Sequence, residues 1–256
     1  MSKRQKFVLI SVLLSVGFVG VNLLDNTYRF LAVGGLTALT VAGFAWSLWE
    51  GLGVNASLLT LILPSLFTLG VGIFWFLLPS LLIARIPVVI MYGLGIYALS
   101  LTANIYTVSA IRTIALMRAA KGVGFVLTLL TSFLLFDAIF SIKADLWVNA
   151  LLVYTSSFLI FFQGLWTSSL DHSISKEVIS SALVFSLILG EIAMTLFFWP
   201  VTVVVGSLFL TVGVYVLLGL GQAQIEGRLF SQTVRDYLTV GVLVFLAMMV
   251  ATQWGA

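Results

Sequence analysis

The chain has 256 residues, of which 61% are hydrophobic and only 8% are charged, and its formal net charge is +3. A soluble globular domain carries about 25% charged residues, so this composition excludes a water-soluble fold and predicts an integral membrane protein. The small net charge gives no reason to expect nucleic-acid binding. The absence of cysteine excludes disulfides and thiolate metal sites.

Long apolar runs recur along the whole chain, which predicts an all-α, polytopic helical bundle. About 20 apolar residues at ~1.5 Å each span the ~30 Å hydrocarbon core, whereas an outer-membrane barrel would show ~10-residue segments of alternating polarity. The linkers are short, so residues 1–256 form one predicted transmembrane domain. The nine predicted spans lie near 7–24, 29–49, 57–78, 87–110, 122–142, 147–169, 178–199, 201–221 and 238–254.

The first span, within residues 1–28, has the basic start and apolar run of a signal peptide. It has no small-x-small cleavage site before Asp25 and its apolar run is long, so we expect an uncleaved first helix.

Lysine and arginine in the short loops predict the orientation, because cytoplasmic loops are enriched in both. With the N-terminus inside and the C-terminus outside, nine of these residues fall on the inner side and three on the outer side, which predicts this N-in, C-out orientation. The inner set is Lys3, Arg4, Lys6, Arg112, Arg118, Lys121, Lys176, Arg228 and Arg235, and the outer set is Arg29, Arg85 and Lys143.

Two basic segments on the predicted inner side, AIRTIALMRAAKG and QIEGRLFSQTVRDY, place apolar residues between charges. They are interpreted as interfacial helices whose bases meet anionic headgroups at ~1 kcal/mol each, or alternatively as topology signals alone. The basic membrane-surface residues are Arg112, Arg118, Lys121, Arg228 and Arg235.

The segments 29–145 and 146–256 resemble each other in order. Each has a Trp-containing inner edge (AWSLWEGL, QGLWTSSL) and an aromatic outer end before a proline (IFWFLLP, LFFWP). This predicts a parallel four-helix repeat after the first helix. The alternative is that any two runs of apolar helices look alike.

Prolines mark predicted irregularities. Pro64 lies inside the third span, Pro79 and Pro87 bracket a short outer segment, and Pro200 is expected to begin the eighth helix. Interrupted helices often accompany transport sites, although Gly and Pro are also simply common in membrane helices.

Glu191 is the only acid in the apolar segment Val178–Pro200. A carboxylate inside a span costs several kcal/mol unless it is protonated, paired or facing water. Ala182, Ser186 and Gly190 form a small-residue ladder beside it, so we expect Glu191 at the edge of a packing face rather than on the lipid. The alternative is a protonated, hydrogen-bonded structural glutamate.

Asp137 is the second intramembrane acid and shares the predicted outer half of the bilayer with Glu191. Two neighbouring carboxyls would suit a proton or cation. The sequence does not establish that their helices touch, and Asp137 could instead reach the outer interface or pair with Lys143.

Uncharged polar residues follow two helix faces. They line a substrate path or hold helices together, since lipid offers them no hydrogen-bond partner. One face has Asn149, Ser156 and Gln163, and the other has Tyr97, Ser100, Asn104 and Thr107.

Catalytic and cofactor motifs are missing. His172 is the only histidine, and the sequence contains no H-E-x-x-H, P-loop or G-x-S-x-G motif. We therefore expect no metal or cofactor, and a membrane enzyme is disfavoured.

The order of the segments PVVIMYGLGIYALSLTANIYTVSAIRTIALMRAAKGVGF, FWPVTVVVGSLFLTVGVYVLLGLGQ and GRLFSQTVRDYLTVGV resembles that of small multipass membrane proteins from uncharacterised bacterial lineages. The resemblance implies a bacterial cytoplasmic membrane and carries no assigned activity.

Three functions stay open from the sequence, of which a membrane-embedded enzyme is the least favoured. The first is a carrier or channel-like protein for a small solute or ion, using Glu191 and Asp137 with the polar faces lining the route. The second is a structural or assembly subunit that uses the same groups between helices. The expected surroundings are the lipid bilayer, with a membrane-protein partner or a second copy left open.

Overall fold

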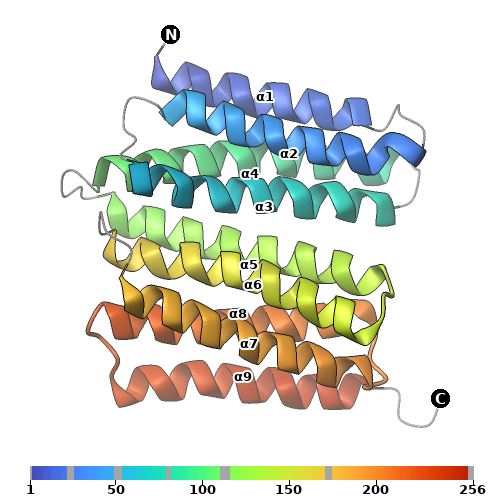
Figure 1. Ribbon diagram of the computed structural model, residues 1–256, viewed down its shortest axis with the longest axis vertical. Coiled ribbons are helices and arrows are strands. Elements are labelled where there is room, and N and C mark those ends of the chain that lie inside the picture. Colours follow the sequence, from blue (N-terminus) through green and yellow to red (C-terminus); the bar gives the residue numbers. More distant parts are fainter. Residues whose placement is uncertain are drawn as a thin grey trace. The chain divides into compact units, whose positions relative to one another are not determined.

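The computed structural model describes residues 2–21, 26–48, 54–78, 82–109, 116–170 and 175–252. These residues form nine α-helices and no strand, which confirms the predicted all-α polytopic bundle (Figure 1). All nine are long and apolar enough to cross a membrane, judged by length and composition. The helices are α1 (Lys3–Val21), α2 (Asn26–Leu48), α3 (Val54–Leu77), α4 (Leu82–Ser109), α5 (Met117–Ser141), α6 (Leu146–Ser169), α7 (Lys176–Phe197), α8 (Val203–Ile225) and α9 (Ser231–Ala251).

The helix irregularities that were predicted at the prolines are not found. Pro64 and Pro87 lie inside continuous α3 and α4, so the prediction of breaks there is wrong. Pro200 does not begin α8 either, because α8 starts at Val203 and the Thr202 hydroxyl accepts the first-turn N–H of Val205. This is the side-chain capping that helix N-termini favour. Pro79 lies outside the described residues.

The basic segment between α8 and α9 is a turn and not a separate interfacial helix. Gly227 has φ of 66°, a left-handed conformation that glycine adopts without strain. The N–H groups of Gly227 and Arg228 donate to the carbonyls of Gln224 and Ala223, the Schellman pattern that ends a helix. The interpretation of this segment as an interfacial helix is therefore wrong, and α9 begins immediately after the turn.

The chain divides into two compact units, Met1–Thr131 and Ser132–Ala256, with the division inside α5. The predicted repeat divides the chain elsewhere, between residues 145 and 146, and stays a prediction.

Unit 1 packs α1 against α2 and α4, α2 against α3, and α3 against α4 (Figure 1). Aromatic rings fill its centre. Tyr92 stacks between Phe18 and Phe67, with ring centroids 4.9 and 5.8 Å away, and Trp75 meets Phe18 edge-on at 4.9 Å. All four side chains are buried, so they join α1, α3 and α4 around one apolar core.

Unit 2 packs α6 against α7 and α8, and α8 against α7 and α9. The small-residue ladder of α7 is buried as predicted, since Ala182 and Ser186 have no exposed surface and Gly190 is buried as well. A Cβ on Gly190 would lie 3.5 Å from Tyr154 Cβ and 3.7 Å from the Ala150 carbonyl oxygen. The ladder therefore lets α7 lie close against α6.

Candidate functional site

Buried hydroxyls in unit 1 satisfy one another. Thr68 Oγ1 lies 3.0 Å from Thr40 Oγ1 and 3.1 Å from Tyr92 Oη, so the three side chains join α2, α3 and α4. All three are at most 1% exposed. These residues have the polar contacts they need and behave as structural links between helices.

Unit 2 is different, because several of its buried oxygens have no hydrogen-bond partner. Within the ranges that the structure describes, these atoms include Asp137 Oδ1, Asn149 Oδ1, Ser157 Oγ and Gln163 Oε1. The four side chains are at most 5% exposed. Most buried polar groups in proteins are hydrogen-bonded, so these acceptors are candidates for binding a ligand, an ion or water. We call these four residues the buried oxygen set.

Asp137 lies on α5, one turn before its end at Ser141, and is 5% exposed. Its side chain is therefore enclosed by the protein. Lys143 is exposed, and no ion pair joins it to Asp137 among the described residues. Of the alternatives left open by the sequence, the structure retains only a carboxyl buried in the bundle.

The polar face of α6 is only partly as predicted. Asn149 and Gln163 are buried, but Ser156 is half-buried and its hydroxyl donates to the Leu152 carbonyl oxygen at 2.7 Å. Ser157, which sequence reasoning missed, is fully buried in its place. A seven-residue spacing drifts about 20° per repeat on a straight helix, so the interior side need not follow positions 149, 156 and 163.

A cavity of about 370 Å³ lies where the α5–α6 and α7–α8 turns meet. Asn149 lines it and also belongs to the buried oxygen set; its Nδ2 donates to the Ala144 carbonyl oxygen at 2.9 Å. Phe140, one turn from Asp137, lines it too. The remaining lining combines charged, polar and apolar residues: Lys143, Ala144, Asp145, Leu196, Phe197, Trp199, Val201, Thr202, Val203 and Gly206.

Apart from Asn149, sequence reasoning did not select the polar residues of this cavity. Lys143 and Asp145 are the charges between the fifth and sixth helices, and Lys143 adopts φ of 53° in the tight turn. Trp199 donates from Nε1 to Thr252 Oγ1 at 2.9 Å, which links the α7–α8 turn to the end of α9. The clustering of polar residues at two turns was visible in the sequence, but their convergence depends on tertiary packing.

Glu191 is exposed, so the prediction that it lies at the edge of a packing face away from lipid is wrong. The buried face of α7 includes Ala182, which precedes Glu191 by nine residues. At about 100° per residue, Glu191 is rotated about 180° from Ala182 and points directly away from the packed side. Asp137 and Glu191 therefore occupy different environments.

The polar face of α4 in unit 1 is mixed. Ser100 and Thr107 are buried, and their hydroxyls donate to carbonyl oxygens of α4 itself. Tyr97 and Asn104 are half-buried. Tyr97 lines a groove of about 440 Å³ between α1 and α4, where Ser11 Oγ donates to the Gly93 carbonyl oxygen at 2.5 Å. This arrangement resembles helix-to-helix packing more than an internal path.

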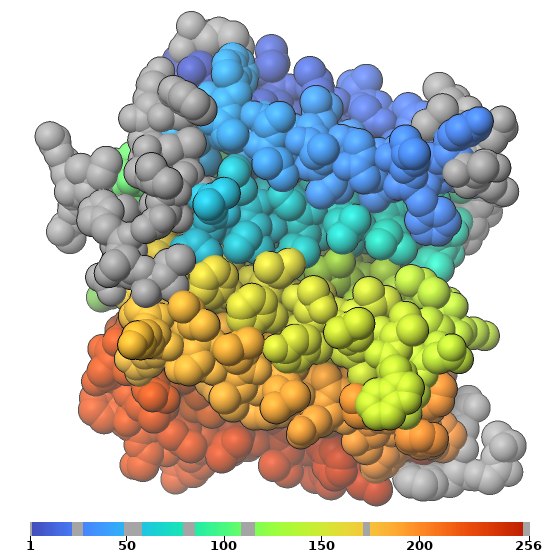
Figure 2. Space-filling view, in the orientation of Figure 1, coloured from blue at the N-terminus to red at the C-terminus, as the bar shows by residue number. Residues whose placement is uncertain are grey.

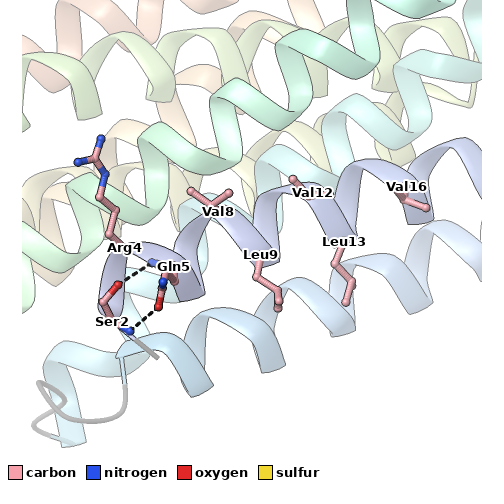
Figure 3. Close-up of a pocket in the computed structure, with 8 residues that line it drawn as sticks. All are labelled: Ser2, Arg4, Gln5, Val8, Leu9, Val12, Leu13 and Val16. Atoms are coloured by element: carbon pink, nitrogen blue, oxygen red, sulfur yellow. Dashed lines mark hydrogen bonds between the residues drawn. The ribbon is translucent and has the colours of Figure 1, made fainter.

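A hollow of about 800 Å³ runs along α1 (Figure 3). At its start, Ser2 and Gln5 exchange side-chain-to-backbone hydrogen bonds of 2.9 and 3.3 Å in a capping box. Val8, Leu9, Val12, Leu13 and Val16 then line it, and all of them belong to one helix. We assign it to the lipid-facing side of α1.

The predicted basic residues lie at helix ends. Arg118, Arg228 and Arg235 are exposed and Lys121 is half-buried, and Arg228 forms an ion pair with Glu226. Arg112 lies outside the described residues.

The described residues contain no group of three His, Cys, Asp or Glu side chains that could hold a metal ion, and His172 lies outside them. The acceptors that the site offers are thus a single carboxyl, two amide oxygens and a hydroxyl.

A comparison with family models matches residues 8–251 to the family described as "Protein of unknown function (DUF5656)". The chain belongs to this family. The match extends from the first turns of α1 to the end of α9, so family membership covers both units. The resemblance to a family without an assigned function is thereby confirmed. No curated protein and no solved structure matches the chain.

Proposed function

We propose that this family member is a carrier for a proton or small cation, and that its path runs through unit 2. The observation that carries the proposal is Asp137, a carboxyl buried within a membrane-spanning helix with a partnerless oxygen. Ionisable groups at such positions mark ion and proton pathways in many membrane proteins.

The chemistry of the buried oxygen set supports a positively charged substrate. All four partnerless atoms are acceptors or can act as acceptors, and carbonyl, carboxylate and hydroxyl oxygens are the ligands of hard cations. On α6 the set extends from Asn149 to Gln163, which is about 21 Å of a ~30 Å hydrocarbon core. Transport needs acceptors over such a depth.

The burial of these atoms favours a carrier over an open channel. Each partnerless oxygen is closed off from solvent, and along α6 Asn149, Ser157 and Gln163 are separated by about 12 and 9 Å. A proton or ion cannot pass between them directly over such distances. Passage would require water entry or a change of conformation, as in alternating access.

The cavity beside Asn149 is the entrance in this proposal. Its volume of about 370 Å³ falls within the range of small-ligand sites. With the N-terminus inside, this cavity would open on the outer side of a bacterial cytoplasmic membrane.

Labelling with a membrane-impermeant thiol reagent tests on which side of the membrane the cavity lies. Lys143→Cys should react from outside intact cells, and Arg228→Cys should react only after the membrane is opened. The reverse result would refute the orientation.

Flux measurements on purified protein in lipid vesicles test the function. A potassium diffusion potential is imposed, internal pH is followed with a dye, and sodium and potassium fluxes are measured separately. We expect wild-type protein to move at least one of these cations. Asp137→Asn should abolish that flux, because the amide keeps the size of the side chain but cannot become negative.

Asp145→Asn is the matched control, since Asp145 lines the same cavity but is exposed. It should retain most of the flux, and thermal unfolding should verify that both variants are folded. The proposal fails if wild-type vesicles are as tight as protein-free vesicles to all three cations. It also fails if Asp137→Asn transports as well as wild type.

The second candidate, a structural or assembly subunit, is favoured by a different observation. Glu191 and its apolar neighbours form an exposed face on α7. A protein whose only role is assembly would give no flux in any vesicle experiment, yet would still associate through that face.

A further inference from the structure

The outward face of α7 is an apolar stripe with one carboxyl at its centre. Val184, Leu187 and Phe198 are 53%, 54% and 74% exposed, and Glu191 and Thr195 are exposed between them. Figure 2 shows α7 (residues 176–197) on an open side of unit 2. The Glu191 carboxyl makes no hydrogen bond or ion pair in the part of the chain that the structure describes.

Glu191 is too deep to reach water along its own helix. It lies six residues before the end of α7 at Phe197, or about 9 Å inside the helix. Helical side chains also tilt toward the N-terminus, which turns the Glu191 carboxyl away from this nearer end. Its two-methylene stem is shorter than the lysine and arginine stems that reach an interface. In a monomer the carboxyl would therefore face lipid.

We propose that this face of α7 binds α7 of a second copy of the chain. The exposed positions Val184, Leu187, Glu191, Thr195 and Phe198 are spaced by three or four residues, the pattern that two helices packed at a small angle present to each other. One polar residue within such an apolar seam fixes the register of the pair.

A second copy supplies the partner that Glu191 lacks. In a dimer whose two-fold axis runs along the membrane normal, the same patch meets itself, so each Glu191 faces the other at the same depth. A neutral carboxyl has one O–H donor and an acceptor oxygen, so two of them can satisfy each other. Thr195 does not compete for this pairing because its hydroxyl donates to the Glu191 backbone carbonyl oxygen at 3.0 Å.

The outer face of α9 is an internal comparison. It is also apolar and exposed, with Val242 and Leu243 57% and 60% exposed. Its exposed acid, Asp236, lies only five residues after the start of α9, and helical side chains tilt toward that nearer end, so its carboxyl can reach the interface. Thr239 on the same side is already satisfied, because its hydroxyl donates to the Arg235 carbonyl oxygen at 2.7 Å. The difference between α7 and α9 is the reason for assigning association to α7.

Cysteine cross-linking of the full chain in phosphatidylethanolamine–phosphatidylglycerol vesicles tests the proposal. The chain has no native cysteine, so Val184→Cys, Leu187→Cys and Leu243→Cys each carry a single thiol. At low protein-to-lipid ratio, oxidation should give a covalent dimer for the two α7 variants and leave the α9 variant monomeric.

The role of Glu191 is tested by measuring the dimer association constant in the same vesicles. Glu191→Gln should retain association, because two amides can also pair reciprocally. Glu191→Leu should weaken association about fivefold to thirtyfold, the range for interhelical hydrogen bonds in model membrane peptides. Residue 191 is exposed in the monomer, so neither substitution should change the thermal unfolding of the monomer.

Three results would overturn the proposal. One is the absence of a dimer with both α7 cysteines. Another is a Glu191→Leu variant that associates as tightly as wild type. The third is cross-linking in native membranes that joins α7 to a different protein, which would assign the face to a partner with its own donor, such as an intramembrane lysine or arginine.

Discussion

Thr68→Val should destabilise unit 1 by about 2 kcal/mol. Thr68 is at the centre of the buried hydroxyl network, with Thr40 on one side and Tyr92 on the other. Valine has nearly the same shape but no hydroxyl, so the substitution removes both interhelical hydrogen bonds without opening a large cavity.

The magnitude follows from the contacts that are lost. Interhelical hydrogen bonds in a membrane protein average about 0.6 kcal/mol and reach about 1.7, so two of them contribute about 1 to 3 kcal/mol. Tyr92 is 1% exposed and its hydroxyl cannot turn to water, which adds a desolvation penalty of about 1 kcal/mol. Thr40 loses less, because its hydroxyl still donates to the Leu36 carbonyl oxygen at 2.9 Å.

Unfolding in mixed micelles, followed by circular dichroism and tryptophan fluorescence, measures the effect. Thr37→Val is the matched control, since the Thr37 hydroxyl donates only within its own helix, to the Val33 carbonyl oxygen at 2.9 Å. It should cost less than about 0.5 kcal/mol. A double-mutant cycle of Thr68→Val with Tyr92→Phe should give a coupling energy of about 0.6 kcal/mol or more. Equal losses for Thr68→Val and Thr37→Val, or strict additivity in the cycle, would refute the reasoning.

Glycine substitutions give two further predictions by the same unfolding assay. Gly95→Ala should destabilise by about 1 to 3 kcal/mol because its Cβ would lie 2.6 Å from the buried Phe67 ring, whereas Gly34→Ala, with nothing within 4 Å, should stabilise α2 by up to about 1 kcal/mol; the same sign for both would contradict the packing. Gly227→Ala should cost about 1 kcal/mol by straining the left-handed turn after α8, although no atom lies within 4 Å of the added methyl. An unchanged unfolding free energy would show that the turn adopts another conformation at no cost.

The number and order of the helices were predictable because the bilayer leaves few choices. Every backbone polar group within it must be paired, so each long apolar run has to be helical. The predicted boundaries were least accurate for α4, α5 and α9, which begin at Leu82, Met117 and Ser231 instead of near 87, 122 and 238. Arg235 and Asp236 lie in the early turns of α9, since a helix can continue beyond the apolar run into the interface.

The position of Glu191 could have been predicted, and that of Asp137 could not. The small residues of α7 suggested a packing ladder. Because the ladder lies beside Glu191 in the sequence, Glu191 was assumed to lie on a neighbouring side of the helix. Counting the nine residues from Ala182 already places Glu191 on the opposite side of the helix. The burial of Asp137 depends on which helices surround the end of α5, and no periodicity within α5 specifies those neighbours.

The two intramembrane acids need opposite kinds of surroundings, and this separates their roles. A group that binds and releases an ion must have an acceptor free at least in one state, because an acceptor already paired would have to give up a hydrogen bond of about 1 kcal/mol before binding. Asp137 meets this condition, because it is buried in the protein and its Oδ1 has no hydrogen-bond partner. The Glu191 carboxyl is instead exposed, where lipid offers it no hydrogen-bond partner but a facing helix can. We therefore propose that the buried carboxyl serves transport and the exposed one serves association. Asp137→Asn should abolish flux without changing the dimer. Glu191→Leu should weaken the dimer whether or not flux is observed.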